Sequence, residues 1–466
     1  MNRKFFQKLT TYLFLLGAFV LFSTQVDAQS KKDQRRAKQL VEQADNSFRK
    51  KDYRGAVNEY QQAVTLVPTD AYAHFWKGLA HHHLNENDLA LPEFELALSQ
   101  GHKKPLDVYL VRWRINYEKK EYDAALDDAK RASVLAPNNV DLFVALGDIY
   151  LAKGDYKEAS DAYQKAILQN PKNADLYYNL ALAKSGLGDT EGQGAAADEA
   201  VRLNAKNLAD SYRLLADARQ KQRRFADAID AYKKALLSKP DIYEAYKNLA
   251  EIYRSENRID DAIDISKRGL AQFPNDGKIY TDLSWFYSVS GRNEDAVQAG
   301  LAGTRLLEGP VSAAAYTNLC RAYNDVKKPE MAITACNSAL RFNPDDGETH
   351  FYIGRAHDLA GKTAEATKYY KRAVTGLITF TANNPESSDG FYLLGNAYFA
   401  DNQREKAIEA YKKCLELNPR FAQAKYNIGI IQVLQKNKVG ALEQYNSLLV
   451  TDKALAGKLK TEIDKL

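Results

Sequence analysis

The sequence predicts an all-α solenoid of about twelve helical hairpins with a C-terminal capping helix. Small residues recur every 34 or 35 positions, with one step of 36 and one of 41, and a second small residue follows seven positions later in eleven of the twelve units. Residues seven apart share one face of a helix, where small side chains let another helix approach closely. Seven of the twelve prolines lie just past a second helix, where the helix must end. The recurring position is occupied by Ala56, Ala90, Ala125, Ala159, Gln193, Ala228, Ala262, Ala296, Ala332, Ala366, Ala407 and Ala441, of which only Gln193 is large.

Residues 140–173, VDLFVALGDIYLAKGDYKEASDAYQKAILQNPKN, form the most regular unit. Gly154 separates two amphipathic helices and Pro171 follows the second. The core-facing positions of the two helices are Phe143, Leu146, Gly147, Tyr150, Ala159, Tyr163 and Ala166. This order resembles the tetratricopeptide repeat. The resemblance implies a right-handed superhelix whose first helices line a concave groove that binds a peptide segment or a partner protein.

The N-terminus has the features of an export signal. Residues 1–28 contain a basic start, an apolar run and the small-x-small sequence Val26-Asp27-Ala28. We therefore expect an exported protein, located in the periplasm or at the outer membrane, with no integral membrane span after signal cleavage. Residues 29–36 are basic and lack an apolar face, so we expect them to be a flexible lead-in or the frayed start of the first helix.

The rest of the chain divides by its repeats. We expect repeats 1–5 in residues 37–206, repeats 6–8 in 207–309 and repeats 9–12 in 310–454, with a capping helix in 455–466. The tenth repeat contains an insertion at 375–388, which predicts a lengthened second helix followed by an Asn-Asn-Pro turn. Glycines in 186–194 and in 300–310 predict weak helices that could act as hinges.

In the family that the chain resembles, an asparagine before the Leu-Gly pair faces the groove and hydrogen-bonds the backbone of a bound peptide. The matching residues here are Asn179, Asn248, Asn318 and Asn427. They either bind a ligand or serve the fold. The position before this asparagine carries Tyr178, Lys247, Tyr392 and Tyr426 in four of the repeats, as candidate groove residues or as packing residues.

Some members of that family grip a C-terminal carboxylate with a set of lysine, arginine and asparagine side chains. Asn396 and Asn427 match part of that set, but Tyr392 replaces the lysine expected one turn before Asn396. We therefore do not predict this specificity.

Two other groups of residues could carry chemistry. Cys320 and Cys336 flank the turn of the ninth repeat, so they either form a disulfide or act as small buried residues. Residues 81–83 are three adjacent histidines, which point in directions about 100° apart on a helix and so do not converge on one ion. We predict no metal site and no cofactor.

The charge and the motifs exclude several functions. The net charge of +5 gives no large basic field for nucleic acid, and no catalytic signature is present in the sequence. We predict a non-enzymatic scaffold that binds a protein or peptide as part of an envelope complex. The alternative is a carbohydrate-binding or enzyme-associated envelope protein that uses groove aromatics. The sequence leaves the oligomeric state open.

Overall fold

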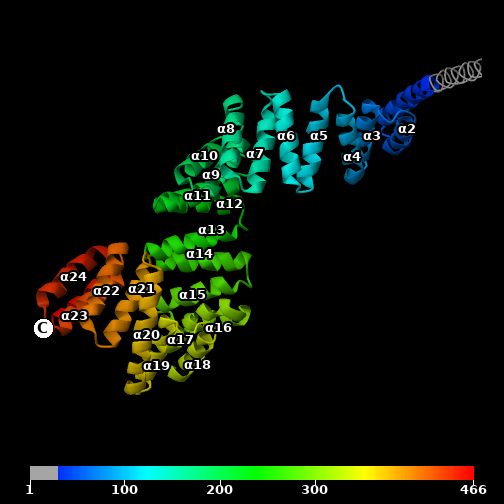
Figure 1. The fold of residues 1–466 in the computed structure, drawn as a ribbon. Helices are drawn as coiled ribbons and strands as arrows, with labels where there is room; N and C mark the ends of the chain where they lie inside the picture. Colours follow the sequence, from blue (N-terminus) through cyan, green and yellow to red (C-terminus); the bar gives the residue numbers. More distant parts are fainter. Residues whose placement is uncertain (1–29) are drawn as a thin grey trace, which may run out of the picture. The chain divides into compact units, whose positions relative to one another are not determined.

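The computed structural model describes residues 30–466, which form stacked antiparallel helical hairpins with no β-strand in that range (Figure 1). The predicted signal peptide, residues 1–28, lies outside the described residues. Within the described part, no helix combines the length and the apolar character needed to cross a bilayer. The chain divides into two compact units that meet between Ala218 and Arg219.

The N-terminal unit contains the first five hairpins and the start of the sixth. Its first helix covers residues 30–49. The helices that follow are α2 (Tyr53–Leu66), α3 (Ala71–His83), α4 (Asn87–Ser99), α5 (Pro105–Glu118), α6 (Tyr122–Leu135), α7 (Val140–Lys153), α8 (Tyr156–Gln169), α9 (Ala174–Gly186), α10 (Thr190–Arg202) and most of α11 (Leu208–Lys221).

The C-terminal unit begins inside α11 and contains the remaining hairpins and the cap. Its helices are α12 (Phe225–Ser238), α13 (Tyr243–Ser255), α14 (Ile259–Gln272), α15 (Gly277–Val289), α16 (Asn293–Leu306), the 3₁₀ turn η1 (Gly309–Ser312), α17 (Ala313–Asp325), α18 (Pro329–Leu340), α19 (Gly347–Leu359), α20 (Thr363–Asn383), α21 (Ser388–Ala400), α22 (Arg404–Leu417), α23 (Ala422–Leu434), α24 (Lys438–Thr451) and α25 (Lys453–Ile463).

Each hairpin turns through one residue with a positive φ angle. This left-handed conformation ends the first helix and reverses the chain. Glycine or asparagine, which adopt it at low cost, occupies seven of these turns, and lysine or arginine occupies the other five. The turn residues are Lys51, Asn85, Lys120, Gly154, Gly188, Arg223, Asn257, Gly291, Lys327, Gly361, Asn402 and Lys436.

A glycine–tyrosine contact joins the two helices of several hairpins. A Cβ atom added at Gly147 would lie 2.5 Å from the ring of Tyr163, and one at Gly395 would lie 2.4 Å from the ring of Tyr411. Both rings are buried, so the glycine is needed to make room for them. This contact explains why the repeat pairs a small residue on its first helix with a tyrosine on its second.

Of the two alternatives for the basic lead-in, the structure has the start of the first helix. Residues 30–36 are the first turns of the helix over 30–49. They contain no glycine or proline, and most of them favour helix. Ala37 and Leu40, which follow directly, are buried against Ala63 of α2 and fix the helix in place.

The glycine-rich segments are ordinary parts of the fold rather than breaks in it. Helix α10 is continuous through Gly192 and Gly194. In α16, a Cβ atom at Gly300 would lie 3.0 Å from Ser284, and one at Gly303 would lie 3.0 Å from Thr281. These glycines let α15 and α16 approach closely.

The end of the chain has the predicted elements. Helix α20 is 21 residues long, so the insertion lengthens the second helix of the tenth hairpin. Helix α25 starts at Lys453, two residues before the predicted start, because Asp452 caps it by accepting hydrogen bonds from the amides of Ala454 and Leu455. Leu459 and Ile463 of this helix are fully buried and cover the last hairpin.

Candidate functional site

The first helices of the C-terminal unit surround a cavity of about 780 Å³. Helices α13, α15, α17, α19 and α21 line it, together with the turn before α23. Five basic and three acidic side chains lie on its walls. Aromatic rings also line it, at Trp285, Phe351, Tyr352, Tyr392 and Phe421.

Two ion pairs join opposite sides of this cavity. Arg254 of α13 pairs with Asp389 of α21. Glu256, directly after α13, pairs with Arg420, before α23, at 2.9 Å. We call these two pairs the clasp. They connect residues that lie 135 and 164 positions apart in the sequence.

Arg321 differs from the other arginines of the cavity. Arg254, Arg355 and Arg420 each pair with a carboxylate, whereas Arg321 has no ion pair or hydrogen bond within residues 30–466. Its guanidinium carbon lies over the ring of Trp285, 5.5 Å from the ring centre, and 5.9 Å from the ring centre of Tyr352. These cation–π contacts position the charge without neutralising it.

Glu348 is the one cavity carboxylate, among the described residues, that has no ion-pair partner within 4 Å. Burial and the negative charge of Asp346 raise the pKa of Glu348 to about 7. A substantial fraction of this side chain is therefore neutral near neutral pH.

Tyrosines on the second helices bind polar residues of the first helices in several hairpins. In five repeats a buried tyrosine donates its hydroxyl to a polar residue of its own first helix at 2.5 to 2.9 Å. The pairs are Tyr60–Asp45, Tyr163–Asp148, Tyr232–Gln220, Tyr370–Asp358 and Tyr411–Asn396. Repeats 7–9 have Ser266, Gly300 and Cys336 in place of the tyrosine. In these three repeats no tyrosine of the same hairpin binds the polar residues of the first helix, although Asn248 of α13 binds Tyr232 of the preceding hairpin.

Cys320 and Cys336 form a disulfide, with 5.3 Å between their Cα atoms. They occupy the positions that hold glycine and tyrosine in other repeats, 16 residues apart like Gly147 and Tyr163. A covalent bond thus replaces the glycine–tyrosine contact in the ninth hairpin. The third cysteine, Cys414, is buried and free.

Two polar atoms at the cavity wall are buried without a hydrogen-bond partner. They are the hydroxyl oxygen of Ser288 on α15 and the amide oxygen of Asn324 on α17. The amide nitrogen of Asn324 donates to the carbonyl of Tyr352 at 2.9 Å, which fixes the orientation of the side chain. An unpaired buried acceptor costs about 1–3 kcal/mol, so these atoms favour a ligand that can donate to them.

The structure separates the predicted site residues. Asn318, Tyr392 and Asn396 line the cavity. Lys247 is exposed and lies beside a second cavity of about 280 Å³. Tyr178 packs in the N-terminal unit and Tyr426 packs near the cap.

The predicted asparagines use their amide groups within the protein. The amide of Asn248 donates to the hydroxyl of Tyr232 at 2.8 Å, and that of Asn318 to the carbonyl of Thr281 at 3.0 Å. Asn427 donates to Asn396 at 3.0 Å. Asn179 lies 3.4 Å from Asp148. These bonds link neighbouring repeats, so the asparagines serve the fold whether or not they also contact a ligand.

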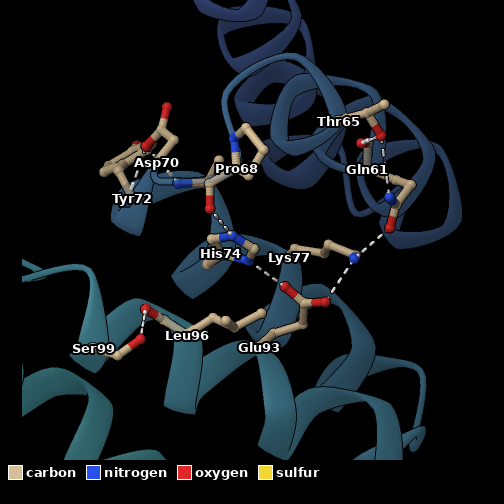
Figure 2. A network of polar contacts seen from close by, with 11 residues as sticks. Gln61, Thr65, Pro68, Asp70, Tyr72, His74, Lys77, Glu93, Leu96 and Ser99 are labelled. Carbon is tan, nitrogen blue, oxygen red and sulfur yellow. Dashed lines mark hydrogen bonds and ion pairs between the residues drawn. The ribbon is translucent and has the colours of Figure 1, made fainter.

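His74 belongs to a buried ion-pair network in the N-terminal unit. Figure 2 shows His74 and Lys77 of α3 converging on Glu93 of α4, each at 2.6 Å, with Gln61 completing the network. The other ring nitrogen of His74 lies 3.0 Å from the carbonyl of Pro68, so both nitrogens act as donors. The hydrogen bond to Glu93 raises the pKa of His74 accordingly.

The other histidines of α3 also have separate partners. His81 bonds Glu86, His82 bonds Asn87 and His83 stacks on Tyr53. In the described part of the chain, no group of His, Cys, Asp or Glu is arranged to hold a metal.

Sequence reasoning missed Arg321, Trp285, Glu348 and Asn324. These residues do not occupy the position of the family asparagine. Repeats 7–9 share the loss of the second-helix tyrosine, but repeats 2, 3 and 5 lack it as well, so this feature alone does not identify the cavity.

Comparisons with known proteins agree with the hairpin geometry. Family models described as TPR repeat match residues 45–85 and 147–188. Models described as tetratricopeptide repeat match residues 174–207, 213–277 and 388–421.

Two curated proteins match short segments at 39% identity. They are a UDP-N-acetylglucosamine–peptide N-acetylglucosaminyltransferase of Giardia intestinalis, over 59 residues, and the inactive peptidyl-prolyl cis-trans isomerase shutdown of Bombyx mori, over 64 residues. Each match covers 13% of this chain, and the chain spans only 4% and 14% of those proteins.

Solved structures with similar folds include yeast Tom70, at 15% identity and a TM-score of 0.39, covering 92% of this chain and 95% of that chain. A tetratricopeptide repeat protein of Parabacteroides merdae has the same identity and TM-score, covering 55% of this chain and 98% of that chain.

Proposed function

Because the chain belongs to the tetratricopeptide repeat family, we propose that it is a protein-interaction scaffold that holds an extended segment of a partner protein in the cavity of its C-terminal unit. The observation that carries this proposal is the cavity itself. Its volume of about 780 Å³ lies in the range of ligand sites, and its wall combines aromatic rings with unpaired polar groups. Aromatic and arginine side chains in a pocket are typical anchors of protein interfaces.

A selection experiment tests this function. A random peptide library displayed on phage is selected on the full chain, and the enriched peptides are labelled with fluorescein for anisotropy measurements. Val289 lines the cavity, so Val289→Trp should fill part of it and weaken binding by roughly tenfold or more, equivalent to about 1.4 kcal/mol.

The matched control is Val439→Trp, at a position on α24 that is 70% exposed and lies outside the cavity. We expect this variant to bind the peptides as the wild type does. The proposal fails if no peptide is enriched, or if the enriched peptides bind Val289→Trp with unchanged affinity.

We also propose that the scaffold works in the cell envelope, where it joins partners of an envelope complex. The export-signal pattern of residues 1–28 supports this location, and a disulfide is typical of oxidising compartments. Mass spectrometry of protein isolated from cells without reductant should find an N-terminus near Gln29 and a joined Cys320–Cys336 peptide. An intact residue 1–28 segment with both thiols free would contradict an exported location.

A further inference from the structure

We propose that the cavity recognises an acidic residue of the bound segment, whose carboxylate pairs with Arg321 while backbone N–H groups of the segment donate to Asn324 and Ser288. This inference rests on the proposed function, because it assumes that a polypeptide occupies the cavity. It adds the chemical class of the bound segment and names the residues that recognise it.

Arg321 carries the first part of the argument. Every other arginine of the cavity forms an ion pair with a carboxylate, whereas the direct contacts of Arg321 are with the rings of Trp285 and Tyr352. Aromatic contacts at a guanidinium leave in-plane N–H donors, and this planar edge fits a carboxylate through two parallel hydrogen bonds. Arg321 is therefore an available site for one anionic group.

Asp325 and Glu348 of the cavity stabilise the charge of Arg321 from a distance, but neither forms an ion pair with it. Asp325 and Asp389 are already paired with Arg355 and Arg254. Glu348 lies beyond ion-pair distance of Arg321, and burial and Asp346 raise its pKa to about 7, so it is only partly charged near neutral pH. Basic side chains outnumber acidic ones in the lining by five to three, which favours an acidic occupant.

The unpaired acceptors distinguish an acidic peptide from a simple anion. Asn324 is only 2% exposed, and its amide oxygen, turned away from the Tyr352 carbonyl that its nitrogen binds, has no donor. Ser288 adds a second unpaired oxygen on the neighbouring helix. Ionised phosphate offers no N–H group, whereas an extended peptide presents both an acidic side chain and backbone donors.

The test uses fluorescein-labelled peptides selected on the full-length wild-type protein. We expect an Asp or Glu at a recurring position in these peptides. Replacing that Asp by Asn in the peptide, which leaves the protein untouched, should weaken binding at least tenfold. Arg321→Gln should weaken binding of the acidic peptide by a similar factor. This variant should also bind the Asp and Asn forms of the peptide with equal affinity. Arg321→Glu should select peptides with Lys or Arg at that position.

Arg341→Gln is the matched control, because Arg341 is exposed at the end of α18 and outside the cavity. It should leave both the affinity and the Asp preference unchanged. If peptides bind in the cavity but the Asp to Asn change or Arg321→Gln leaves their affinity intact, this inference is wrong and the proposed function stands. If inorganic phosphate displaces the acidic peptide as well as an unlabelled copy of the peptide does, the inference that the cavity prefers a peptide to a simple anion is also wrong. If no peptide is enriched, the proposed function itself fails.

Discussion

Polar side chains on the first helices differ in whether they form hydrogen bonds within the protein. Asn248 binds the hydroxyl of Tyr232, and Asn427 binds Asn396, so replacing either one removes a hydrogen bond worth about 1 kcal/mol. A loss of binding in such a variant would combine a structural effect with a ligand effect. Arg321 has no such internal hydrogen bond, which makes it a cleaner probe of the cavity.

Glu348 should make the stability of the C-terminal unit depend on pH. Its pKa is raised in the folded state to about 7, from an ordinary value of 4.5, because burial and Asp346 disfavour its charge. The stability that the folded protein retains while Glu348 is protonated is complete below the pKa that Glu348 has in the unfolded chain. It is lost as the pH rises through the pKa that Glu348 has in the folded chain. Glu348→Gln should therefore gain stability relative to wild type between about pH 5 and pH 8, by about 1–3 kcal/mol.

Urea unfolding at several pH values, followed by circular dichroism, measures this difference. Glu409→Gln, at an exposed carboxylate on α22, is the control and should show no comparable trend. A Glu348→Gln effect that stays constant over this pH range would show that the side chain is not perturbed as described.

At the scale of the helix pair, the glycine–tyrosine contact sets how closely two helices approach. Gly395→Ala should destabilise the C-terminal unit by about 1–3 kcal/mol, because the new methyl group would lie 2.4 Å from the ring of Tyr411. The ring cannot move away easily, since it is 1% exposed and its hydroxyl donates to Asn396 at 2.7 Å.

A second glycine in the same unit provides the comparison. Gly457→Ala in α25 meets no atom within 4 Å and should be neutral or stabilising, because alanine favours helix. Thermal unfolding of the two variants measures the contrast. Equal melting temperatures would mean that close packing is not the role of Gly395.

The hairpins were predictable from the sequence because each one is set by local spacing. Small residues seven apart and prolines after the second helices located every pair, and the insertion at 375–388 correctly indicated a longer α20. The sequence left open whether 30–36 starts the first helix, because its burial begins only at Ala37 and Leu40. Sequence does not show that another helix lies against the glycines of α16, so their role in close packing was not predicted, and the hinge at this place stays a prediction.

At the scale of the whole C-terminal unit, the candidate site could be predicted only in part. Asn318, Tyr392 and Asn396 were found through a family position. The cavity as a whole depends on how rotations between successive hairpins add up, and no single spacing reveals that sum. The clasp is an example, since Arg254 and Asp389 meet although three repeats separate them.

The clasp should contribute to the stability of the C-terminal unit in a salt-dependent way. Arg420→Glu places a like charge beside Glu256 and should lower the unfolding free energy by about 1 kcal/mol at low salt, and by less at high salt, because the pair is partly exposed. The double variant Arg420→Glu with Glu256→Arg restores opposite charges and should recover the loss. Urea titrations at two salt concentrations measure it, and a double variant no better than the single one would argue against a specific pair.

The clasp also changes how this unit should unfold. In a linear array each repeat interacts only with its neighbours, so melting can fray inward from either end, one repeat at a time. The clasp joins the seventh hairpin to the eleventh and to the start of the twelfth, so the intervening repeats form a closed loop rather than an open chain. Partial melting of any repeat within that loop would strain or break the pairs that close it. The backbone amides of hairpins 8–10 should consequently exchange their hydrogens through one common opening event. The walls of the cavity would then unfold as a single cooperative element.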